Sequence, residues 1–396
     1  MASLLSPLRG DALPPSIQTF GAKAAPGTVC CVGRCGWGGT VRPPDKNCKI
    51  DYLMKSFSSA LLHWYEQNKR DLPWRRTRNP YLIWLSEIIL QQTRVAQGLS
   101  YYMCFAARFP TPRALADAPE DEVLKYWQGL GYYSRARNLH AAAKSMDGVF
   151  PKTYEGVRAL KGVGDYTAAA ICSIAYKMPY AVVDGNVYRV LARVYGISTP
   201  IDSPAGKKEF AALAQALLDK KRPDDYNQAV MDFGAMVCTP SAPQCLICPL
   251  AGRCKALAAG AVETLPVKAQ KTKVSARYFH YIYVRQGKNT WLHKRGAGDV
   301  WQNLYEPPLV ETKRAADDFT ADKTYARLFG RKKPVLLLPA VKHVLSHRVI
   351  HADLYEVRIP PSFSVPAEFV SVPATEAKKY AVSRLVQKLL EKAGLL

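Results

Sequence analysis

Four cysteines near the middle of the chain restrict its fold more than any other feature. They are Cys238, Cys245, Cys248 and Cys254, spaced C-x6-C-x2-C-x5-C within "CTPSAPQCLICPLAGRC". Four thiolates in one short loop can ligate a cubane iron–sulfur cluster or a single tetrahedral zinc ion. Prolines keep this loop irregular, so a bound metal would order it. Free or disulfide-bonded cysteines fit the spacing poorly, whereas zinc stays open because ferredoxin spacings differ from this one.

The composition favours a protein of two domains, or three, that binds a polyanion. The length of 396 residues suffices for this, and the hydrophobic fraction of 48% is ordinary for a globular protein. No uncharged run is long enough to cross a bilayer, so no membrane partner is expected. The formal net charge of +23 predicts a polyanion instead. Metal-ligating thiols, with Cys104 and Cys172 in apolar stretches, predict a reducing cytoplasm.

Residues 1–50 differ from the rest of the chain. They are rich in Gly and Pro and have no amphipathic period, which favours a disordered or non-native extension upstream of a native start at Met54. A second metal site or a transit peptide are the alternatives. Four cysteines raise the first of these: Cys30, Cys31, Cys35 and Cys48.

Changes of hydrophobic period divide the remainder. Apolar residues recur at three- and four-residue steps over residues 51–257, which predicts an all-helical domain that ends in the four-cysteine loop. Residues 258–276 are polar and basic and read as a linker. Residues 277–396 alternate as half-buried strands do and close on an amphipathic helix, which predicts an α+β domain. The fold class is therefore mainly α, with a smaller α+β domain at the C-terminus.

Two glycines lie between helices in "LKGVGDYTAAAI". Gly162 and Gly164 allow backbone N–H groups to approach a ligand closely, and the helix that follows adds its positive end. A helix-hairpin-helix holds a DNA phosphate in this way, without reading a base. An ordinary tight turn is the alternative, which the basic all-helical setting disfavours.

Two carboxylates occupy contrasting settings. Glu87 lies in the apolar "IWLSEIIL", so we expect it to be desolvated, with a raised pKa. Asp184 precedes a helix in "AVVDGNVYRV", where an N-cap aspartate is kept ionised by surrounding donors. N-glycosidic cleavage needs such a pair, one group protonated and one charged. A single helix over 81–109 is expected to carry an apolar stripe formed by Trp84, Ile88, Val95 and Leu99, and another face formed by Glu87, Gln91 and Arg94.

An ordered set of long motifs resembles the MutY-type adenine DNA glycosylases of the helix-hairpin-helix superfamily. The motifs are "LPWR", "WLSEIILQQT", "WQGLGYYSRARNL", "LKGVGDYTAAAI", "VVDGNVYRVLAR" and the four-cysteine loop. The resemblance implies a glycosylase fold with a [4Fe–4S] cluster on the four cysteines. It implies a monomeric, monofunctional enzyme of base excision repair, in the bacterial cytoplasm with the nucleoid. The implied partner is double-stranded DNA with adenine opposite 8-oxoguanine or guanine.

The same resemblance implies roles for individual residues. Glu87 is similar to the acid that protonates adenine, and Asp184 to the carboxylate that stabilises the sugar cation, with Tyr166 and Asn186 in support. The residues similar to those that enter the duplex as adenine is extruded are Gln91, Gln92 and Tyr132, with Thr93 beside them. Those similar to the base pocket are Trp74, Arg75 and Leu90.

Two further comparisons refine this interpretation. The related endonuclease III type uses a lysine in a G-V-G-x-K-T pattern, and here Tyr166 takes that position, which removes the nucleophile for strand cleavage. The C-terminal domain resembles a Nudix-like module without a Glu-rich hydrolase helix, so recognition of 8-oxoguanine is the implied role. The family's Phe-Ser-His loop reads Leu345-Ser346-His347. An iron–sulfur redox carrier is the alternative of another class, which the paired carboxylates disfavour.

Overall fold

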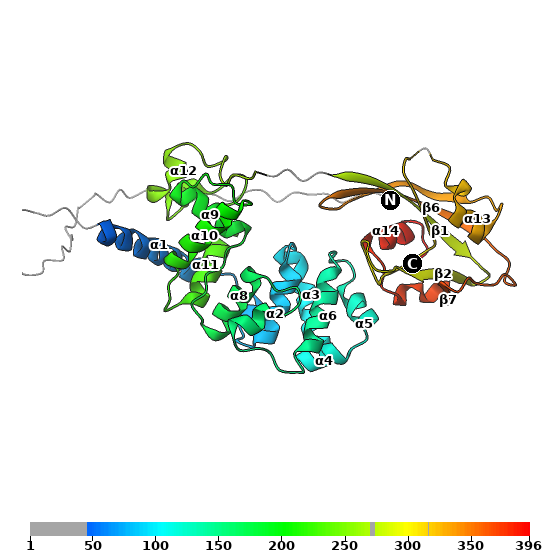
Figure 1. The fold of residues 1–396 in the computed structure, drawn as a ribbon, viewed down its shortest axis with the longest axis horizontal. Helices are drawn as coiled ribbons and strands as arrows, with labels where there is room; N and C mark the ends of the chain where they lie inside the picture. The colour runs from blue at the N-terminus through cyan, green and yellow to red at the C-terminus, as the bar shows by residue number, and fades with distance from the viewer. Residues whose placement is uncertain (1–45, 270–273, 316) are drawn as a thin grey trace, which may run out of the picture. The chain divides into compact units, whose positions relative to one another are not determined.

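The computed structural model describes residues 46–269, 274–315 and 317–396. Residues 50–396 form one compact unit, which contains an all-helical domain followed by an α+β domain. Figure 1 shows the helical domain in blue to green and the strands in yellow to red. The extension predicted over residues 1–50 lies outside the described residues, except where α1 (Lys46–Asn68) begins.

The helical domain is built from helices with strong N-terminal signals. Asn79, Thr111, Thr153 and Ser203 each cap a helix by accepting a backbone N–H, and proline follows three of them. The helices after α1 are α2 (Pro80–Leu90), α3 (Val95–Arg108), α4 (Pro112–Asp117), α5 (Glu120–Trp127), α6 (Ser134–Ser145), α7 (Tyr154–Arg158), α8 (Asp165–Tyr176), α9 (Gly185–Tyr195), α10 (Pro204–Leu217), α11 (Pro223–Met236) and α12 (Lys255–Ala258), with a 3-10 turn, η1, over Pro73–Arg75.

Helices α2 and α8 form the centre of the helical domain. Most side chains of α2 are buried, and in α8 every residue from Thr167 to Ile174 is buried. Helices that are apolar all round belong inside a protein. A polar side chain on either helix is therefore removed from water unless it reaches a pocket.

The helix predicted over 81–109 is wrong in one respect. It is two helices, α2 and α3, separated by a short loop in which Gln92 has a left-handed φ of +54°. Neither glycine nor proline marks this break, and the helical spacing of apolar residues continues across it. The sequence therefore predicts a single helix. Val95 and Leu99 consequently belong to α3 and do not continue the stripe of α2. Arg94 becomes the N-cap residue of α3.

The C-terminal domain contains two sheets. One has the order β4-β1-β6-β5, in which β1 and β6 run parallel and the other pairs antiparallel, and the other has the order β3-β2-β7. The strands are β1 (Ser275–Arg285), β2 (Asn289–Lys294), β3 (Tyr305–Glu306), β4 (Leu309–Thr312), β5 (Val335–Val344), β6 (Arg348–Arg358) and β7 (Phe369–Pro373), joined by α13 (Lys323–Phe329) and closed by α14 (Arg384–Lys392).

Two elements of this domain differ from the predicted pattern. Strand β5 begins with an apolar run over residues 335–341, which periodicity alone does not assign to a strand. The closing helix is shorter than expected, because Ser383 caps α14 and residues 374–379 form a 3-10 turn. The first part of the predicted linker also packs on the helical domain, where Leu265 is buried.

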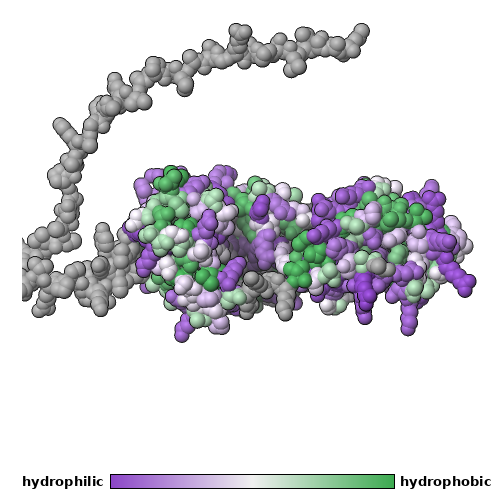
Figure 2. Space-filling model, turned by 90° about the horizontal axis from the view of Figure 1, so that it is seen from above, coloured by the Kyte–Doolittle hydropathy of each residue, from purple (hydrophilic) through white to green (hydrophobic). Residues whose placement is uncertain are grey.

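Polar side chains cover much of the visible face of the molecule, with apolar ones between them (Figure 2). Among the described helices, none combines the length and apolar character needed to span a bilayer.

The tight start of α10 gives a test of the fold. A Cβ on buried Gly206 would lie 2.1 Å from the carbonyl oxygen of Pro200. We expect Gly206→Ala to destabilise the protein by about 1–3 kcal/mol, because backbone must move to relieve the overlap. Thermal unfolding measures this. Gly296→Ala, whose Cβ meets nothing within 4 Å, is the control and should leave the midpoint unchanged.

Candidate active site

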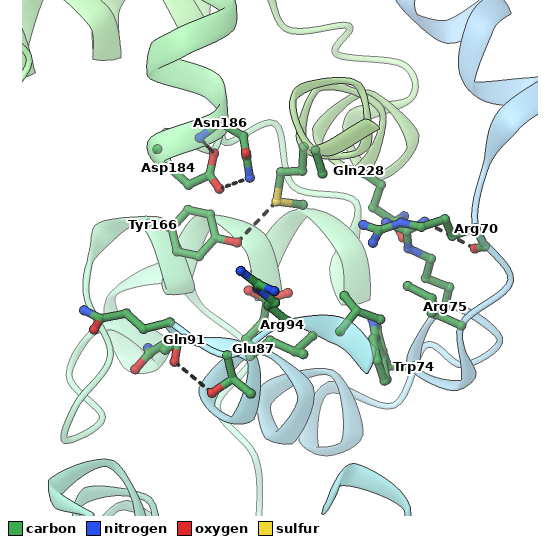
Figure 3. A pocket seen from close by; sticks show the side chains of 18 of the residues that line it. Arg70, Trp74, Arg75, Glu87, Gln91, Arg94, Tyr166, Asp184, Asn186 and Gln228 are labelled. Atoms are coloured by element: carbon green, nitrogen blue, oxygen red, sulfur yellow. Dashed lines mark hydrogen bonds between the residues drawn. The ribbon is translucent and has the colours of Figure 1, made fainter. Parts of the chain in front are cut away.

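A pocket of about 760 Å³ opens between α2, α8, α11 and the N-terminus of α9. It collects ten of the predicted site residues: Trp74, Arg75, Glu87, Leu90, Gln91, Gln92, Thr93, Tyr166, Asp184 and Asn186. In Figure 3 Tyr166 lies between Asp184 on one wall and Glu87 on the other. Segments more than a hundred residues apart in the chain thus meet at one cavity.

Glu87 has the environment expected of an acid that keeps its proton. Its burial raises its pKa to about 7, and the negative charge of Asp184 adds to the rise. A hydrogen bond with Tyr166 and the charge of Arg75 act in the opposite direction. The expected desolvation of Glu87 is present, and it follows from the position of this residue near the end of the buried helix α2.

Asp184 is the N-cap of α9 and is held by three hydrogen bonds. Its Oδ1 accepts from the backbone N–H groups of Asn186, at 2.9 Å, and Val187, at 2.8 Å. Its Oδ2 accepts from Nδ2 of Asn186 at 2.9 Å. Burial raises the pKa of Asp184, and these donors oppose the rise without cancelling it. The carboxylate is therefore fixed in orientation as well as partly desolvated.

Tyr166 joins the two carboxylates. It lies in the first turn of α8, and its hydroxyl is hydrogen-bonded to Glu87 and lies 3.2 Å from Sδ of Met231. Burial and the charges of Glu87 and Asp184 raise the pKa of Tyr166 well above its usual value. The tyrosine therefore stays a neutral hydrogen-bonding group.

Arg75 is fixed by a buried carboxylate. Nη1 and Nη2 of Arg75 donate to the two carboxyl oxygens of Asp232, at 2.6 and 2.8 Å, and Nε of Arg70 donates to one of them at 3.0 Å. Burial alone would raise the pKa of Asp232, but these hydrogen bonds hold it below its usual value. The network places a rigid cation on the pocket wall.

Sequence analysis missed the contribution of α11. Gln228, Met231 and Ala235 of this helix line the pocket, and Asp232 anchors Arg75 from behind. Polar Gln228 and Asp232 inside a largely buried helix were the available signal, because polar groups in such places need partners.

The glycine hairpin lies outside this pocket. Gly162 has a φ of +83°, and Gly164 is the N-cap of α8, with open space where a Cβ would stand. Both glycines are exposed. The first N–H groups of α8 are thus accessible to an anion, as the sequence predicts.

The remaining predicted residues form a second group. Leu345, Ser346 and His347 lie in the turn between β5 and β6, and Ser346 and His347 are exposed. Tyr132, with a φ of +48°, places its hydroxyl 2.7 Å from Oγ of Ser346. The predicted wedge tyrosine and the predicted reading loop therefore meet through a hydrogen bond.

The four cysteines surround a cavity of their own. Cys238, Cys245, Cys248 and Cys254 line it, and all four are free thiols. Arg193, almost fully buried, directs Nη1 to Sγ of Cys238 at 3.4 Å. Among the described residues no three His, Cys, Asp or Glu side chains converge on a position for one metal ion. The thiols, the cavity and the adjacent cation fit a bound group with several negative sulfur atoms.

Comparison with known proteins decides the family. Residues 85–217 match the HhH-GPD superfamily of base excision DNA repair proteins, and residues 280–392 match the NUDIX domain. The adenine DNA glycosylase of Buchnera aphidicola subsp. Acyrthosiphon pisum is 32% identical over 314 residues, which cover 77% of this chain and 87% of that protein. The chain belongs to the adenine DNA glycosylase family.

Other members and a solved structure agree with this assignment. The human adenine DNA glycosylase is 46% identical over 214 residues, which cover 51% of this chain and 39% of that protein. The structure of a thermostable thymine-DNA glycosylase, 30% identical, covers 53% of this chain and 99% of that chain with a TM-score of 0.50. The predicted family and fold are confirmed, as is the enzyme class, a DNA glycosylase of base excision repair.

The raised pKa of Glu87 predicts a dependence of stability on pH. The folded protein holds this proton up to about pH 7, whereas the unfolded chain loses it near 4.5, so the contribution of Glu87 to stability falls between these values. We expect Glu87→Gln to gain stability relative to the wild type over this window, by roughly 3 kcal/mol in all. Chemical denaturation at several pH values measures the difference. A difference that stays constant from pH 4.5 to 8 would contradict the pKa.

Proposed function

We propose that this glycosylase removes adenine mispaired with 8-oxoguanine or guanine from double-stranded DNA. The observation that carries the proposal is that two carboxyl groups line one pocket. Glu87 has a pKa near 7, and Asp184 accepts hydrogen bonds from the N-terminus of α9. Cleavage of an N-glycosidic bond needs a proton for the leaving base and a negative charge for the sugar. We further propose that the enzyme acts as a monomer in the cytoplasm, with the nucleoid.

Glu87 supplies the proton. An adenine extruded into the pocket meets the side chains of Trp74 and Leu90, which form an apolar wall. Beside them lies the guanidinium of Arg75, which Asp232 holds in place. The protonated Glu87 then donates to a ring nitrogen of the base as the bond to the sugar breaks. Once ionised, the same carboxylate takes a proton from the water that attacks the sugar.

Asp184 stabilises the sugar. As the base leaves, positive charge develops on the deoxyribose, and a fixed carboxylate in a partly desolvated pocket stabilises that charge more than mobile water does. Asn186 orients the carboxylate through its side chain and its backbone. Tyr166 lies where a lysine nucleophile would be needed for strand cleavage, so the enzyme is a monofunctional glycosylase.

Substitution of the two carboxylates tests the mechanism. We expect Glu87→Gln and Asp184→Asn to retain DNA binding but to lose nearly all base release, because each group acts only as the bond breaks. Single-turnover release of adenine from an A·8-oxoguanine duplex measures this, with strands uncut until alkali is added. Near-normal rates in either variant would refute the assignment. Glu209→Gln, an exposed carboxyl group on α10 outside the pocket and away from the glycine hairpin, is the matched control.

The cofactor that we propose is a [4Fe–4S] cluster on Cys238, Cys245, Cys248 and Cys254. The cavity that these four thiols surround, and the buried cation Arg193 beside Cys238, support a bound group with several negative sulfur atoms. When bound, the cluster would order the loop between α11 and α12.

Metal analysis of the purified protein tests the cofactor. We expect about four irons per chain and matching acid-labile sulfide, as in other [4Fe–4S] proteins. Replacement of Cys245 by serine should lower the iron content. One zinc per chain without sulfide would overturn the proposal.

We propose that the turn between β5 and β6 reads the base opposite adenine. 8-Oxoguanine differs from guanine by an N7–H donor and an O8 acceptor, and the exposed hydroxyl of Ser346 and imidazole of His347 can bond to such groups. Leu345 replaces the family's phenylalanine and is partly buried, so the polar pair carries the reading. The hydrogen bond between the hydroxyl groups of Ser346 and Tyr132 supports this location.

The preference for the lesion tests this reading. Changing Ser346 and His347 together to alanine should weaken the preference for A·8-oxoguanine over A·G by about 1–3 kcal/mol, because one or two hydrogen bonds are lost. Binding and single-turnover rates on both duplexes measure the change, and the rate on bound substrate should fall less than recognition does. An unchanged preference would move the reading to Tyr132.

A further inference from the structure

One buried guanidinium contacts both loops that carry the proposed wedge residues. Arg135, on α6, is 9% exposed. Its Nη1 donates to the carbonyl oxygens of Ile88 and Ile89, each at 3.0 Å, and to that of Gln91. These carbonyls belong to the last turn of α2, where no intrahelical N–H is available to them. Arg135 thus caps the C-terminus of α2, the helix that carries Glu87.

The same side chain reaches the second loop. Nη2 of Arg135 lies 3.3 Å from the carbonyl oxygen of Gly131 and 3.4 Å from Oγ1 of Thr93. The guanidinium carbon lies 5.1 Å from the ring centre of Trp127 and 5.5 Å from that of Tyr132. The group is therefore held between the loop from α2 to α3 and the loop from α5 to α6.

Arg135 has an unusual electrostatic setting for a buried cation. Within the described parts of the chain, no carboxylate forms an ion pair with it. Carbonyl dipoles and the faces of two aromatic rings surround its charge instead, and Nε has no hydrogen-bond partner. Burial lowers its pKa to about 10, which still leaves it charged at neutral pH. A buried charge retained at this cost indicates a specific role.

Each of the two loops has one non-glycine residue in a left-handed conformation. Gln92 has a φ of +54° and Tyr132 a φ of +48°. Such conformations cost free energy and persist only where surrounding contacts enforce them. Arg135 contacts the residues on both sides of Gln92 and the residue before Tyr132. Both residues are exposed, as wedges must be.

We propose that Arg135 is a positioning residue that holds Gln92 and Tyr132 as one rigid unit for extrusion of the adenine. The inference rests on the proposed function, in which both residues enter the duplex. Arg135 is not part of the pocket lining, so it acts through the two loops and not on the base. A side chain inserted between stacked bases keeps them apart only if its loop stays in place. The hydrogen bonds of the Arg135 guanidinium hold both loops in place.

The experiment compares two substrates that differ in the cost of extrusion. Both contain adenine opposite 8-oxoguanine, one with paired neighbours and one with mismatches on either side, which lower the cost of unstacking. Full-length Arg135→Met keeps the apolar stem and loses the donors, and Arg135→Lys keeps the charge. Lys144→Met, an exposed cation on the same helix, is the control.

For Arg135→Met we expect the single-turnover rate to fall about tenfold on the paired substrate and less than about twofold on the mismatched one, with Arg135→Lys between. Equal loss on both substrates, or no loss, would overturn the proposal. If Arg135→Met does not fold, the ratio for Arg135→Lys decides.

A second readout separates this proposal from the proposed function. The fluorescence of 2-aminopurine in place of adenine reports extrusion when every protein also carries Glu87→Gln, so that the base stays attached. We expect a smaller rise when an Arg135 substitution is added than with Glu87→Gln alone or with Lys144→Met added. If the wild type releases adenine from neither duplex, the proposed function fails, and the fluorescence still tests the positioning role. An equal rise for all proteins would refute that role.

Discussion

The proton on Glu87 is the feature on which the rest of the site depends. It remains bound to about pH 7 because the carboxyl lies on a helix that is apolar on nearly all sides and faces the negative charge of Asp184. Two neighbouring groups oppose this rise in the pKa of Glu87. Tyr166 hydrogen-bonds to Glu87, and Arg75, held by Asp232, places a positive charge nearby. The pKa of Glu87 therefore lies close to neutral pH, so the carboxyl group can readily give up its proton there.

Helix ends, more than helix faces, position the functional groups. Asp184 caps α9, Tyr166 lies in the first turn of α8, and Glu87 lies in the last turn of α2. Side chains at these places can use free backbone N–H and C=O groups that the middle of a helix does not offer. The sharp break after α2 is part of this arrangement, since it turns Gln91 and Gln92 toward the pocket mouth.

Much of this arrangement could be predicted from the sequence, and the failures have physical reasons. The apolar flanks of Glu87 and the cap position of Asp184 depend on local sequence, so both environments were predictable. The break between α2 and α3 was not, because the buried contacts of Arg135, and no turn residue, stabilise it. Asp232 was missed since its two arginine partners lie more than a hundred residues away in the chain. Gln228 was missed since only the folded chain brings α11 to the pocket. Strand β5 was missed because its first seven residues are apolar and have no period.

The identity of residue 166 also decides what remains after the reaction. A phenol has no amine with which to form an imine, so in the proposed reaction the sugar that has lost its base stays in an unbroken strand. Such an abasic position is chemically labile and carries no coding information. The proposed reaction therefore leaves strand incision to a separate activity, and that step cannot begin until the enzyme has left the abasic product.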